Sequence, residues 1–112
     1  MKIAVVQQPP VYLDLAKSMA RAVELVQEAA GMGCKMVVFP ETWLPGYPTF
    51  VWRLSPGAGM GKTDELYALS QANSVDLSKD GLRPLQDLQA TSTTGISGSL
   101  ADGVCSVRRA HA

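Results

Sequence analysis

A glutamate in a proline-rich bend is the side chain of this sequence best suited to acid–base chemistry. Glu41 comes just after the apolar run Met36 to Phe39. In open α/β sheets, ligands bind outside the carboxyl ends of the strands, so a carboxylate at this position lies where a site is expected. Phe39, Trp43 and Tyr47 are expected to wall the carboxylate and partly desolvate it. Partial desolvation suits a general base that works near neutral pH.

The residues after Glu41 restrict the backbone of the bend. Prolines stand at positions 40, 45 and 48, and Gly46 allows backbone angles that other residues avoid. We therefore expect a stiff loop that holds the base in place. Trp43, Tyr47 and the turn at Gly46 are expected to shape the site around it.

Other nucleophiles and metal ligands are few. Cys34 and Cys105 are the two cysteines, and His111 is the one histidine. These residues make neither a disulfide framework nor a metal-ligand set, so we expect reduced thiols and no metal. Cys34, at the start of an apolar run, is expected to be a small buried hydrophobic residue. Cys105 is disfavoured as a nucleophile because no suitable histidine or lysine context accompanies it.

A glycine-rich stretch from Pro56 to Thr63 leaves nucleotide binding open as a minor alternative. It resembles a phosphate-binding loop, which needs four residues between its first glycine and Gly61-Lys62-Thr63. Counting back from Gly61, that first position is Pro56, and starting from Gly57 leaves one residue too few. The spacing matters because successive backbone amides must wrap around the phosphates.

Two apolar runs and one amphipathic stretch must position the bend. Ile3 to Val6 and Met36 to Phe39 are continuous apolar runs, which are typical of strands covered on both faces in a parallel sheet. From Leu15 to Ala30, apolar residues fall on one stripe at helical spacing, and Asp14 is placed to cap the start of this helix. Strand, helix and strand at these lengths predict a βαβ unit, hence the α/β class.

The rest of the chain is expected to be less regular. Glu41 to Gly61 is predicted to be a long ordered loop, with a short strand from Phe50 to Leu54 as one option. Helices are predicted from Thr63 to Asn73 and from Asp80 to Gln89. Thr91 to Ala112, rich in Ser, Thr and Gly, is predicted to be a weakly structured tail.

Composition favours a globular protein and excludes several partners. The 112 residues suit one domain, with 46% hydrophobic and 18% charged residues. Ten basic residues balance ten acidic ones, so neither nucleic acid nor an anionic membrane is an expected partner. The sequence contains no run of about eighteen apolar residues, so no membrane span is expected. The stretch Met1 to Val6 is too short for a secretory signal, so a cytoplasmic location is expected.

Residues 33–48, GCKMVVFPETWLPGYP, closely resemble the glutamate signature of the nitrilase, or carbon–nitrogen hydrolase, family. Several fixed positions over this length are far more specific than a lone short motif. The opening strand Lys2 to Gln8 and the helix after it also resemble the family. So do Asn73-Ser74 and Leu82 to Leu85. The resemblance covers roughly residues 1–86 and then fades.

The resemblance implies a fold and a reaction. The fold would be the N-terminal βαβ portion of an αββα sandwich, here incomplete. The reaction would hydrolyse non-peptide carbon–nitrogen bonds, converting a nitrile to a carboxylic acid and ammonia through a Glu–Lys–Cys triad, with no cofactor. Glu41 would take the thiol proton, the cysteine would attack the nitrile or amide carbon, and the lysine would stabilise developing charge. The family also implies self-association. The residues around Glu41 resemble those of true nitrilases, and the amidase branch of the family is the alternative.

The family's lysine and cysteine are not recognised in this sequence. Cys105, within Gly-Val-Cys-Ser, does not match the family's cysteine motif. We therefore predict that residues 1–89 form the N-terminal part of a carbon–nitrogen hydrolase domain. Residues 90–112 are predicted to be a tail unlike the family, from a truncated gene or a shifted reading frame. The alternative function is a non-catalytic fragment.

Overall fold

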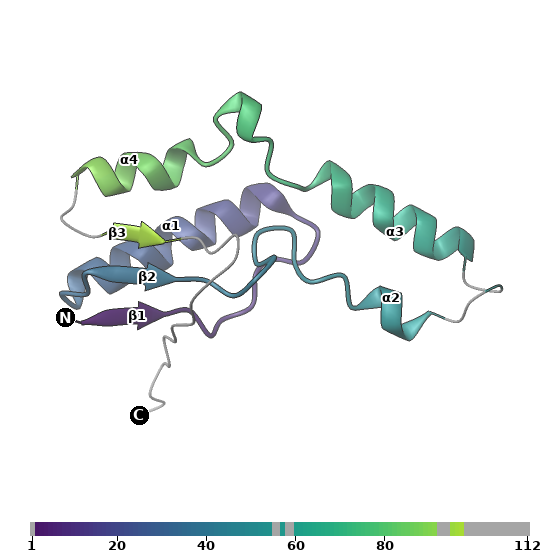
Figure 1. Ribbon diagram of the computed structural model, residues 1–112, viewed down its shortest axis with the longest axis horizontal. Helices are drawn as coiled ribbons and strands as arrows, with labels where there is room; N and C mark the ends of the chain where they lie inside the picture. Colours follow the sequence, from purple (N-terminus) through teal and green to yellow (C-terminus); the bar gives the residue numbers. More distant parts are fainter. Residues whose placement is uncertain (1, 55–56, 58–59, 92–94, 98–112) are drawn as a thin grey trace.

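The structure, a computed structural model, describes residues 2–54, 57, 60–91 and 95–97 (Figure 1). Its elements in chain order are β1 (Ile3–Val5), α1 (Leu15–Gly31), β2 (Met36–Val38), α2 (Phe50–Arg53), α3 (Met60–Ala72), a 3-10 turn (Leu77–Lys79), α4 (Arg83–Thr91) and β3 (Gly95–Ser97). Strands and helices alternate through the first part of the chain, and the predicted α/β class is confirmed.

The three strands form one parallel sheet in the order β1-β2-β3. Ala4 pairs with Val37, and Val37 pairs with Ile96. The predicted βαβ unit is thus present. The prediction of a weakly structured tail is wrong for Gly95–Ser97, which adds a third strand. Strand formation here depends on pairing with β2, and no local pattern in the sequence signals that pairing.

Helix α1 covers the sheet and begins and ends as its sequence predicts. The side chain of Asp14 accepts a hydrogen bond from the backbone N–H of Lys17 at 3.0 Å and caps the helix. Beyond its last turn, Gly33 adopts φ +75° and donates its N–H to the carbonyl of Ala30. Glycine is the residue that adopts this left-handed conformation without steric strain.

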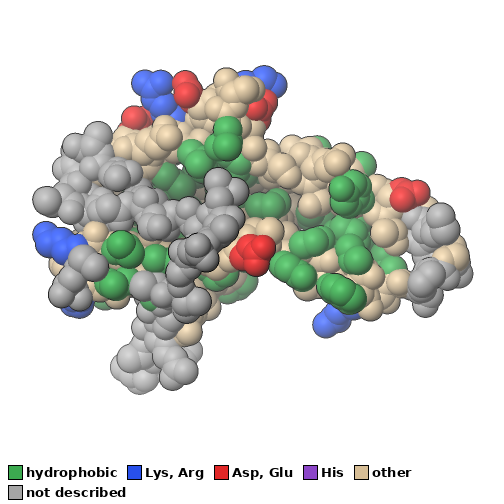
Figure 2. All heavy atoms as spheres, viewed as in Figure 1, with side chains coloured by type: hydrophobic (Ala, Val, Ile, Leu, Met, Phe, Trp, Pro, Cys, Tyr) green, Lys and Arg blue, Asp and Glu red, His purple; other side chains and the backbone are tan. Residues whose placement is uncertain are grey.

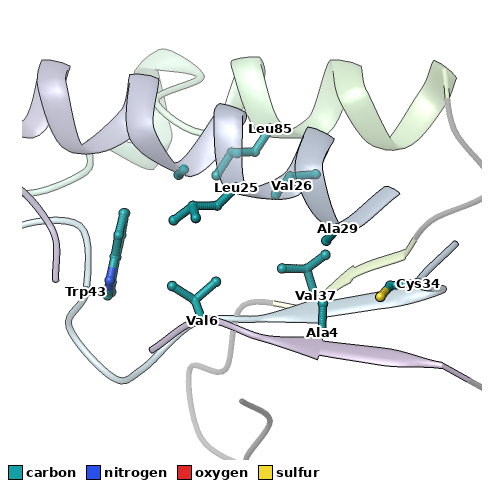
Figure 3. Packing of buried hydrophobic residues seen from close by; sticks show 10 residues of the cluster. Ala4, Val6, Leu25, Val26, Ala29, Cys34, Val37, Trp43 and Leu85 are labelled. Atoms are coloured by element: carbon teal, nitrogen blue, oxygen red, sulfur yellow. The ribbon is translucent and has the colours of Figure 1, made fainter. Parts of the chain in front are cut away.

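The hydrophobic core lies between α1 and the sheet (Figure 3). Its buried members come from five segments: Ala4 and Val6; Ala22, Leu25, Val26 and Ala29; Cys34 and Val37; Trp43; and Leu85. Cys34 is 4% exposed, which confirms its prediction as a small buried hydrophobic residue. Burying each of the larger aliphatic side chains contributes about 1.5–3 kcal/mol, so this cluster is what holds β2 and the following bend against α1.

Two segments differ from their predictions. Phe50–Arg53 is a short helix and not a strand, because one side chain alone, Phe50, turns inward while Val51 and Trp52 stay exposed. That burial pattern is not the alternation of a strand. Helix α4 begins at Arg83 instead of Asp80, because Asp80 ends the 3-10 turn in a left-handed conformation with φ +54°. The helix predicted from Thr63 is present but starts earlier, at Met60.

The Asp14 cap predicts a pH dependence of stability. The hydrogen-bonded ion pair with Lys17 Nζ, at 2.9 Å, is the main cause that holds the pKa of Asp14 below its ordinary value, and the bond from the Lys17 N–H adds to it. A carboxyl whose pKa is depressed on folding stabilises the fold above its unfolded pKa of about 4, and this contribution is lost as the pH falls through the folded pKa. We expect Asp14→Asn to flatten the acid limb of urea-melt stability below about pH 4. Parallel acid limbs in the two proteins would contradict this.

Candidate functional site

Glu41 lies where the sequence predicts, after β2 at the carboxyl edge of the sheet, but its surroundings differ. Its side chain is exposed, so the predicted partial desolvation is wrong in this structure. Trp43 is 5% exposed and turned into the core, and Tyr47 is 51% exposed. Trp43 turns into the core because its indole N–H finds an acceptor there: it donates to the backbone carbonyl of Gln8 at 2.7 Å. An indole that packs in the core needs such an acceptor, and this bond satisfies the buried N–H of Trp43.

Trp43 still braces the strand end from which Glu41 emerges. Its ring meets Phe39 edge-on, with centroids 4.9 Å apart and planes at 60°. Aromatic pairs in this arrangement add about 0.5–1.5 kcal/mol beyond their buried area. The two aromatic residues therefore stabilise the backbone on both sides of Glu41, which is a supporting role and not a wall around the carboxylate.

The residue after Glu41 has an unusual backbone conformation. Thr42 adopts φ +52°, and its Oγ1 donates to the carbonyl of Glu41 at 2.8 Å. A β-branched residue at positive φ is rare and costs about 1–3 kcal/mol, so it persists only where the surrounding structure holds it. Such strained residues cluster at functional sites. The direction in which Glu41 leaves the strand is therefore imposed by contacts elsewhere in the bend.

Gly46 closes the bend. Its N–H donates to the carbonyls of Thr42, at 3.0 Å, and Trp43, at 3.2 Å, and its φ is +86°. The ring of Tyr12 lies directly against it, since a Cβ at position 46 would stand 2.5 Å from Tyr12 Cδ2. The predicted glycine turn is confirmed, and it has two reasons to be glycine: the backbone angle and the aromatic ring.

The connection between β1 and α1 holds this bend from the side. The N–H of Leu13 donates to the carbonyl of Pro45 at 3.2 Å. The connection is itself fixed by Ser18, a fully buried residue of α1. The Oγ of Ser18 accepts from the N–H of Val11 at 3.0 Å and donates to the carbonyl of Val11 at 2.9 Å. A short chain of hydrogen bonds thus runs from α1 to the loop that carries Glu41.

Three residues at the site were not found from the sequence: Gln8, Tyr12 and Arg21. Arg21 Nη2 donates to Gln8 Oε1 at 2.9 Å, and Gln8 in turn accepts from Trp43 through its carbonyl. Their partners lie 13 and 35 positions away along the chain. No local periodicity encodes such pairs, and only the βαβ topology brings them together.

The described residues limit the chemistry that this site performs by itself. Among them, no three His, Cys, Asp or Glu side chains are grouped so that they could hold a metal ion. Cys34 precedes β2 and Glu41 follows it, so the strand separates this thiol from the carboxylate. Cys105, His111 and Pro56 of the glycine-rich stretch lie outside the described residues. The arrangement presents one accessible carboxylate on a braced bend, able to accept a proton from a group brought to it.

None of the helices described in the structure is both long enough and apolar enough to cross a membrane.

Comparison with known proteins gives relatives whose names describe nitrile-hydrolysing enzymes. The chain is 49% identical over 61 residues to an aliphatic nitrilase of Rhodococcus rhodochrous, covering 54% of this chain and 17% of that enzyme. It is 55% identical over 51 residues to an arylacetonitrilase of Fusarium vanettenii, covering 46% and 15%. A nitrilase of Pseudomonas syringae pv. syringae is 43% identical over 60 residues, covering 54% and 18%. The matches thus span less than one fifth of the length of these relatives.

The family model described as carbon-nitrogen hydrolase matches residues 2–101. The match includes all three strands and the bend that carries Glu41. It also runs past residue 89, where a boundary between the hydrolase part and the tail is predicted, and that boundary stays a prediction. The parallel βαβ unit, the glutamate at the sheet's carboxyl edge and this match agree. The chain belongs to the carbon–nitrogen hydrolase family.

Proposed function

We propose that this chain forms the part of a nitrile-hydrolysing active site that carries the general base, with Glu41 as that base. The observation that supports this most is the position of Glu41: an accessible carboxylate at the carboxyl end of β2, on a bend held by hydrogen bonds from the β1–α1 connection. The nitrilase names of the relatives favour nitriles as substrates over amides.

In the proposed reaction Glu41 takes the proton of a cysteine thiol. The thiolate adds to the nitrile carbon, and the nitrile nitrogen takes up the proton that Glu41 holds. A first water then adds to the same carbon, which releases ammonia and leaves a thioester. A second water releases the carboxylic acid and regenerates the thiol. No cysteine or lysine beside Glu41 is found among the described residues, so those two roles require groups that the described structure does not hold. An exposed carboxylate is compatible with this, because the thiol must approach it from the open side.

Ammonia release tests the proposal on the chain itself. The purified chain is incubated with an aliphatic nitrile, with phenylacetonitrile and with the corresponding amides, and ammonia and acid are measured. Release from nitriles supports nitrile hydrolysis, and release from amides alone supports the amidase branch. Absence of both products assigns the chain to the second candidate function, a non-catalytic fragment.

A specific surface favours that second candidate. Apolar side chains gather on the arm formed by α2 and α3, which projects from the sheet (Figures 1 and 2). Val51, Trp52 and Tyr67 are 51%, 79% and 56% exposed.

Self-association of the chain, which we also propose, would cover part of this surface. Sedimentation velocity tests it: a monomer at all concentrations contradicts the proposal.

A chimera separates the role of Glu41 from the activity of the isolated chain. The stretch from Ile3 to Arg53, which holds β1, α1, β2 and α2, replaces the matching residues of the Rhodococcus rhodochrous nitrilase. Hydrolysis of nitriles by this chimera shows that the stretch supplies a working base. A folded but inactive chimera argues against the proposed function, whatever the isolated chain does.

A further inference from the structure

We propose that Gln8 is a positioning residue that couples helix α1 to the bend that carries Glu41. The proposal rests on the proposed function, because positioning has a catalytic meaning only if Glu41 is the base. Gln8 itself would touch neither substrate nor nucleophile. It would act through Trp43, two residues after Glu41.

Two hydrogen bonds from different elements meet at Gln8. Its backbone carbonyl accepts from Trp43 Nε1 at 2.7 Å, and its side-chain Oε1 accepts from Arg21 Nη2 at 2.9 Å. Both bonds are short, and the second has a charged donor, which makes such bonds stronger than neutral ones. One residue thereby links a side chain of α1 with the aromatic residue that braces the bend.

The side-chain bond holds Gln8 in a segment that lies outside the sheet. Gln8 lies beyond β1, two residues after Val6, whose N–H donates to the carbonyl of Val38. Pro9 follows and restricts Gln8 to extended backbone angles, but it supplies no N–H to anchor the connection. The bond from Arg21 therefore fixes a peptide group that the sheet does not hold.

The guanidinium of Arg21 is consistent with this specific use. Its Nε is buried and has no hydrogen-bond partner among the described residues, while its Nη2 donates to Gln8. A buried N–H without a partner is unfavourable, so packing alone would be served better by an apolar side chain of similar length. The favourable contact that the group makes here is the one to Gln8.

Hydrogen exchange measured by NMR on the full chain tests the proposal through three protons. The Trp43 indole N–H reports on the bond to Gln8, and the Gly46 amide reports on the bend. The Val6 amide, bonded to Val38 in the sheet, reports on global stability. Gln8→Met removes Oε1, the acceptor for Arg21, at nearly constant volume, and keeps the backbone carbonyl that accepts from Trp43. We expect it to raise exchange at Trp43 and Gly46 about tenfold while Val6 changes little.

Two further variants complete the design. Gln8→Glu keeps an oxygen acceptor for Arg21 and should restore the slow exchange at Trp43 and Gly46. Arg21→Met breaks the same hydrogen bond by removing its donor, and it also removes the buried partnerless N–H. It should likewise raise exchange at Trp43 and Gly46 with little change at Val6, so the proposal is still tested if Gln8→Met fails to fold. Unchanged rates at Trp43 and Gly46, or an equal rise at Val6, would overturn the proposal.

The outcome does not depend on turnover. Local acceleration at Trp43 and Gly46 together with an inactive chimera would leave the Gln8 bridge standing and reject the proposed function. Unchanged exchange together with an active chimera would reject the bridge alone.

Discussion

Replacing Glu41 with glutamine in the nitrilase chimera is expected to lower kcat for nitrile hydrolysis by about 10²- to 10⁴-fold. Glutamine keeps the size of the side chain and its place on the bend, but its amide does not accept the thiol proton. The nucleophile then stays a thiol, which is a far weaker nucleophile than the thiolate. Initial rates of ammonia release over a range of nitrile concentrations give kcat and KM separately.

A matched control separates loss of the base from loss of a charge. Glu28 is an exposed glutamate of α1, on the same chimera and far from the bend in sequence. Glu28→Gln should leave kcat within about twofold, since surface substitutions change stability little. Equal activity of Glu41→Gln and the unmodified chimera would show that Glu41 is not the base. A fall shared by both variants would point to a general loss of folded enzyme.

Glu41 is exposed in the described chain, so the chimera also tests whether the rest of an enzyme can shield it from water. The bend positions Glu41, but Phe39 and Trp43 pack with the core and Glu41 stays exposed. Exclusion of water strengthens electrostatic interactions and is part of how active sites work. In the proposed enzyme, that exclusion must come from elements that approach Glu41 from its open side. The described chain therefore positions the Glu41 carboxylate, and the rest of the chimera is expected to exclude water from it.

Much of the frame around Glu41 could be predicted because it follows from local patterns. The two apolar runs gave the paired strands, the stripe from Leu15 to Ala30 gave α1, and Asp14 gave its cap. Gly46 predicts a turn because glycine allows backbone angles that other residues avoid. Each of these features depends on residues that are neighbours in the sequence, where periodicity and capping preferences apply.

The contacts that orient the site could not be predicted in the same way. Trp43 was placed beside the carboxylate because it is near in sequence, yet the positive φ of Thr42 and the carbonyl of Gln8 turn it into the core. The strand Gly95–Ser97 could not be predicted for a similar reason, because the strand it pairs with, β2, is distant from it in the sequence. Interactions of this kind are set by topology, which no window of the sequence contains.

Gly46→Ala is expected to destabilise the chain by about 2–5 kcal/mol, the largest effect on stability that we predict for a single methyl group. An added Cβ must tolerate φ +86°, which costs roughly 1–2 kcal/mol for a residue other than glycine. It also stands 2.5 Å from Tyr12 Cδ2, and relieving that overlap costs a further 1–3 kcal/mol or so. Urea unfolding followed by circular dichroism measures the change.

Gly33→Ala provides the matched control, because the two glycines share a backbone conformation but not a neighbour. Gly33 has φ +75°, and a Cβ there would meet nothing within 4 Å, so this variant should lose about 1–2 kcal/mol from the backbone angle alone. The difference between the two variants then measures the overlap with Tyr12. Adding Tyr12→Ala to Gly46→Ala should remove most of that difference, a coupling that residues in contact show and distant ones do not. Equal losses at positions 33 and 46 would mean that Tyr12 does not hold the bend.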